Sequence, residues 1–418
     1  MPEYVVDPIA EVYRFTSVHP TFHALFKPCY EHLFNGSGYL CAWQRHYIAL
    51  MAATRHRCLI LMDYHTVMFR RCGGDEDWLA GITSADARFQ SLDVFNRFMA
   101  HQPWMLNAAQ IHGIVGKGTP DAVKTFALHE LNEACLVLAQ THVFCSFICA
   151  LGIERRGDLA PAELDFLNCD DIDYLRSKEE DNEMDEDSMG ELESLVRRMM
   201  ELETQANEQK EKEKFSNVDC AAGGESPERP AEEEDMGMPV YSRDPRFSYQ
   251  DFQDRPDRGI RPFRIDEFSW DHAYNLISDL NPDSAYLFDN CFRHIQRLTY
   301  RFMGQHSLKI DTSRYREAVW NYIQGLYGIR YDDYDYSRVN VLIDKATKSF
   351  IKTAACFPHK LTTELAHVMS CFKTSEKIHV VIIVMEARLQ AILLHFTRAL
   401  CNYNAQMLAK NGYKRPLD

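Results

Sequence analysis

The sequence predicts an all-α protein, and three observations support this fold class. Apolar side chains recur every three or four residues in several long segments, which is typical of helices with one buried face. The alternation of apolar and polar residues expected of half-buried strands is nearly absent. An acidic stretch separates two helical portions of the chain. Because 418 residues exceed one ordinary core, we expect more than one folded unit.

Four segments show the clearest helical pattern. The apolar face of the first continues from Trp43 to His65, so we expect one long helix there. The second is apolar almost all round and should therefore be buried. The third is expected to end with Gly328 as its C-cap, and the fourth to begin after Ser375 as its N-cap. These predicted helices cover residues 43–65, 127–151, 314–328 and 375–406.

The acidic stretch predicts a linker over residues 170–245. Residues 179–193, "EEDNEMDEDSMGELE", include nine acidic side chains and cannot bury enough apolar area to offset the entropy lost on ordering. We therefore expect a partly disordered linker between a domain at 1–169 and another at 246–418. Its one short helix should dock on a folded half through an apolar stripe of Leu192, Leu195, Met199 and Leu202.

Composition excludes several classes of protein. The net charge of −15 argues against nucleic acid as a partner, because phosphate binding needs clustered Lys and Arg. The N-terminus lacks the basic and apolar regions of a secretory signal, and Glu386 and Arg388 interrupt the longest apolar run, so no membrane insertion is expected. Thirteen scattered cysteines fit a reducing compartment. We expect a cytoplasmic or also nuclear protein.

Cys58 is the best candidate for a reactive thiol. Its neighbours Arg55, His56 and Arg57 are cations that would lower a thiol pKa, and His65 could relay a proton. On an unbroken helix, however, seven residues separate Cys58 from His65 by roughly 10 Å. The alternative is that Cys58 is a small buried core residue. Because His and Cys nowhere show the spacing of a zinc site, we expect no metal and no cofactor.

Three segments of the second half contain groups that could bind a free amino acid. Such a ligand needs a cation for its carboxylate, an anion for its ammonium and an apolar cavity. The alternative is that these residues are unrelated surface charges. The candidate residues are Thr299, Tyr300, Thr312, Arg316, Glu376 and His379.

Residues 328–336, "GIRYDDYDY", could bind a metal, act as acid and base, or contact another protein. Asp332 and Asp333 follow the predicted helix end, and no His or Cys stands beside them to complete a transition-metal site. Exposed carboxylates flanked by Tyr331, Tyr334 and Tyr336 suit a protein contact, with aromatic area for binding and charge for specificity. We interpret the stretch as a docking surface.

Taken together, these segments resemble the sestrins, stress-induced regulators of the target-of-rapamycin kinase. The resemblance covers both folded halves, leaves out only the linker, and indicates an invertebrate-type member. It implies two related helical domains of the alkylhydroperoxidase (carboxymuconolactone decarboxylase-like) type. The motifs that carry it are "RHYIALMAATRHRC", "GGDEDWLAG", "MAHQPWML", "DEFSWDHAYNLI", "AVWNYIQGLYGIRYDDYDY", "FIKTAACFP" and "SEKIHVVIIVMEARLQA".

The resemblance also implies a function. Sestrins are negative regulators of target-of-rapamycin complex signalling that bind the GATOR complex, and Asp332 and Asp333 match the residues that contact it. The six amino-acid-binding candidates match the family's leucine pocket, with Arg316 for the ligand carboxylate and Glu376 for its ammonium. Phe302 stands where the vertebrate sensor has a threonine, and Met369 where it has a tryptophan.

The family's peroxidase relay, Cys-x-Tyr-x4-His, matches Cys58, Ile60 and His65. The catalytic cysteine and histidine are present, but isoleucine replaces the tyrosine and cannot pass a proton. The alternative function is therefore a thiol-dependent alkyl hydroperoxide reductase centred on Cys58, with weak activity and a role in the oxidative stress response.

Overall fold

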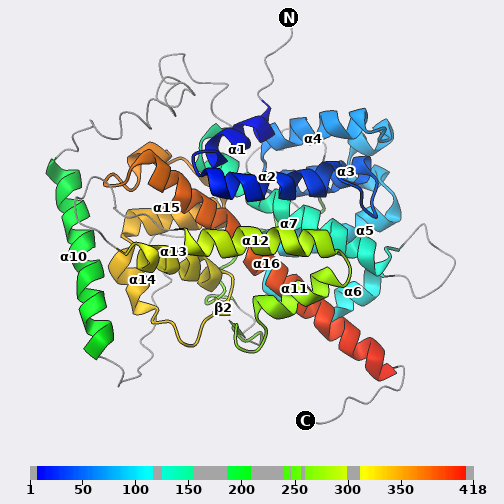
Figure 1. The fold of residues 1–418 in the computed structure, drawn as a ribbon. Coiled ribbons are helices and arrows are strands. Elements are labelled where there is room, and N and C mark those ends of the chain that lie inside the picture. Colours follow the sequence, from blue (N-terminus) through cyan, green and yellow to red (C-terminus); the bar gives the residue numbers. More distant parts are fainter. Residues whose placement is uncertain are drawn as a thin grey trace, which may run out of the picture.

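The structure is a computed structural model that describes residues 7–115, 125–153, 186–208, 240–244, 246–255, 259–298 and 311–410. Helices make up nearly all of its regular structure (Figure 1). The two strands in the described ranges are β1 (Phe263–Arg264) and β2 (Ile329–Arg330), which pair in parallel with Phe263 opposite Ile329. The prediction of an all-α protein is confirmed.

Seven α-helices lie in the described part of the first half. The predicted helix at 127–151 is confirmed as α7, which is buried along most of its length. Short 3₁₀ turns connect several of the others: Glu76–Ala80, Ile82–Ser84 and Pro103–Met105. The helices are α1 (Pro8–Thr16), α2 (Pro20–Asn35), α3 (Ala42–Arg55), α4 (Leu59–Arg71), α5 (Ala87–His101), α6 (Ala108–Ile114) and α7 (Leu128–Ala150).

The prediction of a single helix from Trp43 to His65 is wrong. α3 ends at Arg55, α4 begins at Leu59, and Arg57 between them has a left-handed φ of 51°. The two helices pack against each other. The apolar periodicity continues across this break because both helices turn their apolar faces toward the same core, and neither Gly nor Pro marks the turn.

The second half contains six α-helices in its described ranges. The predicted helix at 314–328 is confirmed as α13, although its C-cap is Tyr327 and Gly328 is the left-handed residue that follows, with φ 75°. The predicted helix at 375–406 is confirmed as α16, which already begins at Thr374, so Ser375 lies inside it. The helices are α11 (Trp270–Ser278), α12 (Pro282–Arg297), α13 (Ser313–Leu326), α14 (Ser337–Leu342), α15 (Lys345–Cys356) and α16 (Thr374–Lys410), with 3₁₀ turns at Pro358–Lys360 and Leu365–His367.

The helix predicted within the linker is α10 (Glu186–Glu208), which is longer than expected. It lies beside α14 at one edge of the molecule (Figure 1). Its Leu192, Leu195 and Met199 are buried, and Arg198 Nη1 donates to the carbonyl of Val341 at 2.7 Å. Most of the predicted linker lies outside the described residues, so the boundaries at 1–169, 170–245 and 246–418 stay predictions.

One continuous hydrophobic core contains residues of both halves. α16 crosses α7, and α12 packs on α2 (Figure 1). By length and composition α7 and α16 could each cross a membrane, but the apolar window of each is completely buried inside the protein. These two helices are the centre of the core. The eleven cysteines within the described ranges are free thiols.

Arg388 of α16 joins the two halves by polar contacts in the middle of this core. Its side chain is fully buried. Nη1 donates to the carbonyl of His142 at 2.9 Å and to the hydroxyl of Ser146, both on α7. Nη2 donates to the carbonyl of Ala100 at 3.0 Å and to Nε2 of His56 at 3.2 Å. One side chain therefore ties α16 to α7, α5 and the turn between α3 and α4.

Candidate functional site

The expected amino-acid site lies where α13 and α16 begin. Thr312 and Arg316 on one helix start, and Glu376 and His379 on the other, are all buried. Arg316 Nη1 donates to the hydroxyl of Thr312, because residues four apart share one face of a helix. The pKa of His379 is well below its usual range, through burial first and then through the charges of His19 and Arg316. The structure thus brings Thr312, Arg316 and His379 together.

Glu376 lies in the first turn of α16, where a carboxylate is stabilised by the positive end of the helix. Its Oε2 accepts the backbone N–H of Lys373 at 2.9 Å. The pKa of Tyr315, which precedes Arg316 on α13, is raised by burial first and also by the charge of Glu376. α13 and α16 pack against each other, so this carboxylate lies at the start of the helix that packs on the one carrying the guanidinium.

His19, between α1 and α2, also belongs to this site, and sequence reasoning missed it. Its Nε2 makes a hydrogen bond of 3.0 Å with the carbonyl of Ser375, and its ring centroid lies 5.3 Å from that of His379. No periodicity or motif pointed to His19, which is more than 350 residues away from its partner in sequence. The first half of the chain therefore contributes to a site that was predicted within the second half.

The other predicted members of this site are only partly described. Thr299, Tyr300 and Phe302 lie outside the described residues. Met369 is buried before the start of α16 and has a left-handed φ of 55°. Such a conformation costs energy for a residue other than glycine and is most often kept where the surroundings require it.

Asp332 and Asp333, the predicted docking residues, are held differently. Asp332 follows β2, and its two carboxylate oxygens share the N–H of Arg264 Nε on β1, at 2.7 and 2.9 Å, while Nη2 of the same guanidinium lies 2.6 Å from Oδ2. This guanidinium lowers the pKa of the Asp332 carboxyl. Asp333 is exposed, and within the described ranges its carboxylate makes no ion pair. The structure therefore leaves Asp333 more accessible to a partner than Asp332.

The tyrosines of this stretch do not offer the aromatic contact area that the sequence suggested. Tyr334 is buried. The hydroxyl of Tyr336 accepts the backbone N–H of Tyr331 at 3.0 Å, and both rings are half-buried. The tyrosine rings pack within the stretch at 328–336, so the groups that this stretch exposes are its carboxylates.

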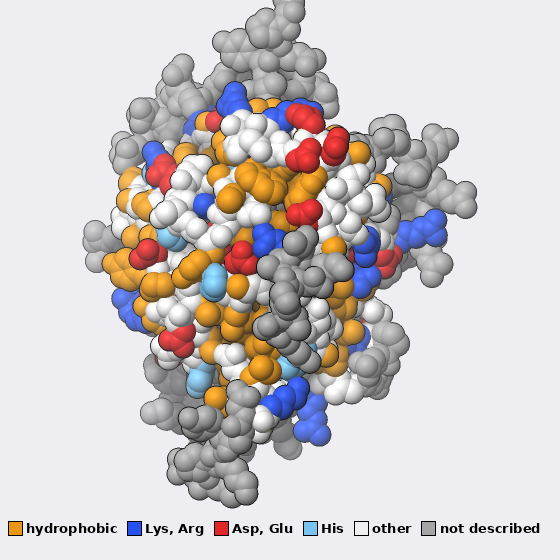
Figure 2. Space-filling view, turned by 90° about the vertical axis from the view of Figure 1, so that its right-hand side faces the viewer, with side chains coloured by type: hydrophobic (Ala, Val, Ile, Leu, Met, Phe, Trp, Pro, Cys, Tyr) orange, Lys and Arg blue, Asp and Glu red, His pale blue; other side chains and the backbone are white. Residues whose placement is uncertain are grey.

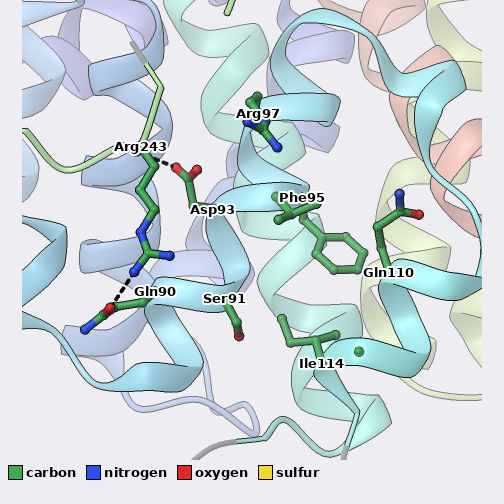
Figure 3. Close-up of a pocket in the computed structure, with 10 residues that line it drawn as sticks. Gln90, Ser91, Asp93, Phe95, Arg97, Gln110, Ile114 and Arg243 are labelled. Atoms are coloured by element: carbon green, nitrogen blue, oxygen red, sulfur yellow. Dashed lines mark hydrogen bonds between the residues drawn. The ribbon is translucent and has the colours of Figure 1, made fainter.

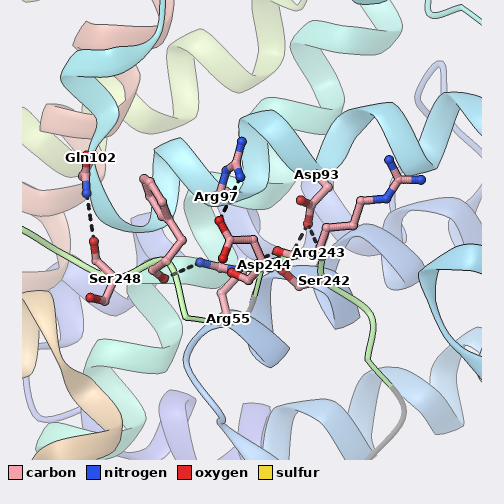
Figure 4. A network of polar contacts seen from close by, with 9 residues as sticks. Arg55, Asp93, Arg97, Gln102, Ser242, Arg243, Asp244 and Ser248 are labelled. Atoms are coloured by element: carbon pink, nitrogen blue, oxygen red, sulfur yellow. Dashed lines mark hydrogen bonds and ion pairs between the residues drawn. The ribbon is translucent and has the colours of Figure 1, made fainter. Parts of the chain in front are cut away.

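Cys58 is fully buried at the residue that precedes α4, but two of the cations expected around it serve other contacts. Arg55 points to the segment at 242–247, where it donates to the hydroxyl of Ser242 at 2.9 Å and to the carbonyl of Asp244 at 2.8 Å (Figure 4). His56 contacts Arg388 and His142 and, because burial holds its pKa well below the usual range, is neutral.

His65, the expected proton relay, is buried on α4 and makes a hydrogen bond with His46, the two Nδ1 atoms lying 3.1 Å apart. Burial first, and then His46, holds the pKa of His65 well below its usual range. Ile60, at the position of the family's tyrosine, is half-buried and packs against the core. A catalytic role for Cys58 and His65 stays a prediction.

The family model described as "PA26 p53-induced protein (sestrin)" matches residues 4–404. A sestrin homolog of Caenorhabditis elegans is 40% identical over 99% of this chain and 97% of its own length. Human sestrin-2 is 33% identical, covering 95% of this chain and 84% of the human protein, and mouse sestrin-3 is 32% identical over 93% and 84%. The chain belongs to the sestrin family and is a stress-responsive regulator of the sestrin type.

Proposed function

We propose that this protein restrains target-of-rapamycin complex signalling in the cytoplasm by binding the GATOR complex, and that an amino acid bound between α13 and α16 controls this interaction. The observation that carries the proposal is the meeting of Thr312, Arg316 and His379 at one buried helix junction, with Glu376 at the start of α16, which packs on α13. Matching residues form the leucine pocket that the family resemblance implies.

The charges at this junction suit a zwitterionic ligand. Burying a guanidinium and a carboxylate costs several kcal/mol per ion unless each is compensated. A free amino acid offers a carboxylate to Arg316 and an ammonium to Glu376, and its binding would contribute to that compensation. Met369 is an unbranched side chain that adapts to different apolar partners. We expect leucine to bind weakly or not at all, and another apolar amino acid to bind better.

Calorimetry with the twenty amino acids tests the ligand, and thermal unfolding with the same panel checks it. We expect one or more apolar amino acids to raise the melting temperature, and Arg316→Ala and Glu376→Gln to abolish the rise. Lys345→Ala and Glu364→Gln, which change exposed charges of the same half, should leave it intact. If no amino acid binds at millimolar concentration, amino-acid sensing is excluded for this chain.

Co-purification with GATOR components tests the docking surface. We expect Asp333→Asn to lose the complex, because Asp333 is the accessible carboxylate. Arg264→Gln should weaken it less, because it removes the ion pair that holds Asp332 in place beside Asp333. Glu364→Gln is the matched control. An Asp333→Asn protein that still binds GATOR would place the interface on another surface, provided its melting temperature is unchanged.

Thiol peroxidase activity is a second candidate function, and one observation favours it. Cys58 directly precedes α4, and the positive end of a helix lowers a thiol pKa. The test is consumption of an organic hydroperoxide with a thiol reductant present. Activity lost in Cys58→Ser but kept in Cys72→Ser, a variant of a half-buried thiol at the other end of α4, would support it. Equal activity of all three proteins would exclude it.

A further inference from the structure

A cavity of about 380 Å³ lies in the first half, apart from the sites described above. α5, α6 and the segment at 240–244 surround it. Figure 3 shows Phe95 and Ile114 in the middle of its lining, with Arg243 and Gln90 on one side and Gln110 on the other. Its size falls in the range of small-molecule sites, which are mostly apolar with a few placed polar groups.

The charged groups at this cavity leave one positive charge in excess. Arg97 and Arg243 are the cations in its lining, and Asp93 is the anion. Arg55 and Asp244 lie in the polar network beside it and offset each other. This excess occurs in a chain whose net charge is −15. The side of the molecule on which α5 and α6 lie shows apolar side chains with charges of both signs scattered between them (Figure 2).

The excess cation is Arg243. Arg97 pairs with Asp244, with Nη1 and Oδ2 3.2 Å apart. Arg243 Nη2 donates to Oε1 of Gln90, a neutral acceptor, at 2.5 Å. In the part of the chain that the structure describes, no carboxylate lies within ion-pair distance of this guanidinium. Gln90 is itself fixed, because its Nε2 donates to the carbonyl of Ala85 at 2.7 Å.

The backbone around Arg243 is also fixed before any ligand binds. Its N–H donates to Oδ1 of Asp93 at 3.0 Å, and the hydroxyl of Ser242 donates to the same oxygen at 3.1 Å (Figure 4). Arg55 of α3 donates to the carbonyl of Arg243 at 3.1 Å. Asp244 has a left-handed φ of 51°, and such strain is commonly kept where a ligand is held.

We propose that this cavity binds a small organic acid with one carboxylate and an apolar body. Arg243 binds the carboxylate, and the apolar body lies on Val94, Phe95 and Ile114. The Nε2 amide of Gln110 makes no hydrogen bond within the described ranges and can donate to a second ligand oxygen. A dianion such as phosphate fits less well, because only one positive charge is in excess and much of the lining is apolar.

Binding of phenylacetate, hexanoate, phenylacetamide and inorganic phosphate, measured by calorimetry on the full chain, tests the ligand class. We expect the two carboxylates to bind and the amide and phosphate to bind at least about 10-fold more weakly, as loss of a charge-assisted hydrogen bond predicts. The ligand carboxylate could belong to a free acid or to the C-terminus of a protein. A peptide that ends in phenylalanine with a free carboxylate distinguishes these two sources. Equal binding of the amide, or preference for phosphate, would overturn the proposal.

Two variants locate the site. Arg243→Gln should weaken phenylacetate binding about 10-fold or more, whereas Arg246→Gln, which changes an exposed arginine outside the cavity lining, should not. Gly113→Leu should fill the cavity and abolish binding, because a Cβ at Gly113 meets no atom within 4 Å. Its melting temperature should stay at or above that of the wild type. Binding retained in either variant would place the acid elsewhere and overturn the assignment.

Discussion

α16 carries buried titratable side chains in two regions with different surroundings. At its start, Glu376 and His379 lie at a junction of helix ends, and Glu376 keeps a hydrogen bond to a local backbone N–H. In its middle, Glu386 and Arg388 are completely enclosed, and Arg388 donates to groups of the other half of the chain. The difference teaches that polar groups on one helix can be satisfied locally at its end and by a distant part of the chain at its centre.

The largest effect is expected from Arg388→Met, which keeps the apolar volume and removes the guanidinium. The acceptors on α5, α7 and His56 would lose their donor inside the core, so we expect unfolding free energy to fall by about 3 kcal/mol. Urea denaturation measures this. Arg398→Met is the control, because Arg398 is half-buried over the ring of Phe263. A stabilised Arg388→Met protein would show that the central charge does not serve assembly.

Glu386 should make the stability of the protein depend on pH. Burial raises its pKa from 4.5 to about 8, and within the described residues its Oε2 has no hydrogen-bond partner. Between these values the unfolded chain loses the proton while the folded chain keeps it, so this group makes stability fall as pH rises. The expected slope is up to about 1.4 kcal/mol per pH unit.

Glu386→Gln should remove this slope, so the variant should gain stability relative to the wild type between pH 5 and pH 8. Urea denaturation at unit intervals of pH measures the difference. Glu364→Gln, at an exposed position, should follow the wild type. Parallel curves for Glu386→Gln and wild type would mean that this carboxyl titrates normally.

A smaller effect is expected from His19→Ala, which tests the start of α16. It removes the hydrogen bond to the carbonyl of Ser375, so unfolding free energy should fall by about 1 kcal/mol. The rise in melting temperature caused by an amino acid should also become smaller, because His19 packs beside His379. His112→Ala, which removes a hydrogen bond to Gln406, is the control and should keep the full rise. A His19→Ala protein with an unchanged ligand response would separate His19 from the site.

The smallest effect is expected from Ser370→Ala. Its hydroxyl donates to Glu191 of α10 at 2.8 Å and so links that helix to the segment before α16. Global stability should change by less than about 0.5 kcal/mol, as for most surface substitutions. Hydrogen exchange of the α10 amides should nevertheless become faster, because local opening needs less free energy. Ser349→Ala, at an exposed serine of α15, should leave it unchanged.

Helical periodicity was enough to predict α13, which buries a regular apolar face, whereas long apolar stretches predicted α7 and α16, which are buried almost all round. It could not show the break at Arg57, where the apolar pattern passes through a turn without Gly or Pro. That break also changes the surroundings of Cys58, since the side chain of Arg55 bonds to the carbonyl of Asp244 and that of His56 to Arg388.

The sequence predicts that two residues lie together when they are on neighbouring turns of one helix. Thr312 and Arg316 are four residues apart, so helix geometry alone brings them together. His19 and Ser375, or Asp93 and Arg243, are brought together only by tertiary packing of distant segments. A single sequence contains no signal for such pairs, and for that reason both the His19 contact and the cavity beside Arg243 came from the structure.

The burial of Arg388 against α5 and α7 has a practical consequence for fragment studies. A fragment that ends in the acidic segment would expose the apolar face of α7 that α16 covers, and the complementary fragment would expose the face of α16 that carries Arg388. Neither piece should be soluble when expressed alone, whereas the two expressed together should assemble as a split protein.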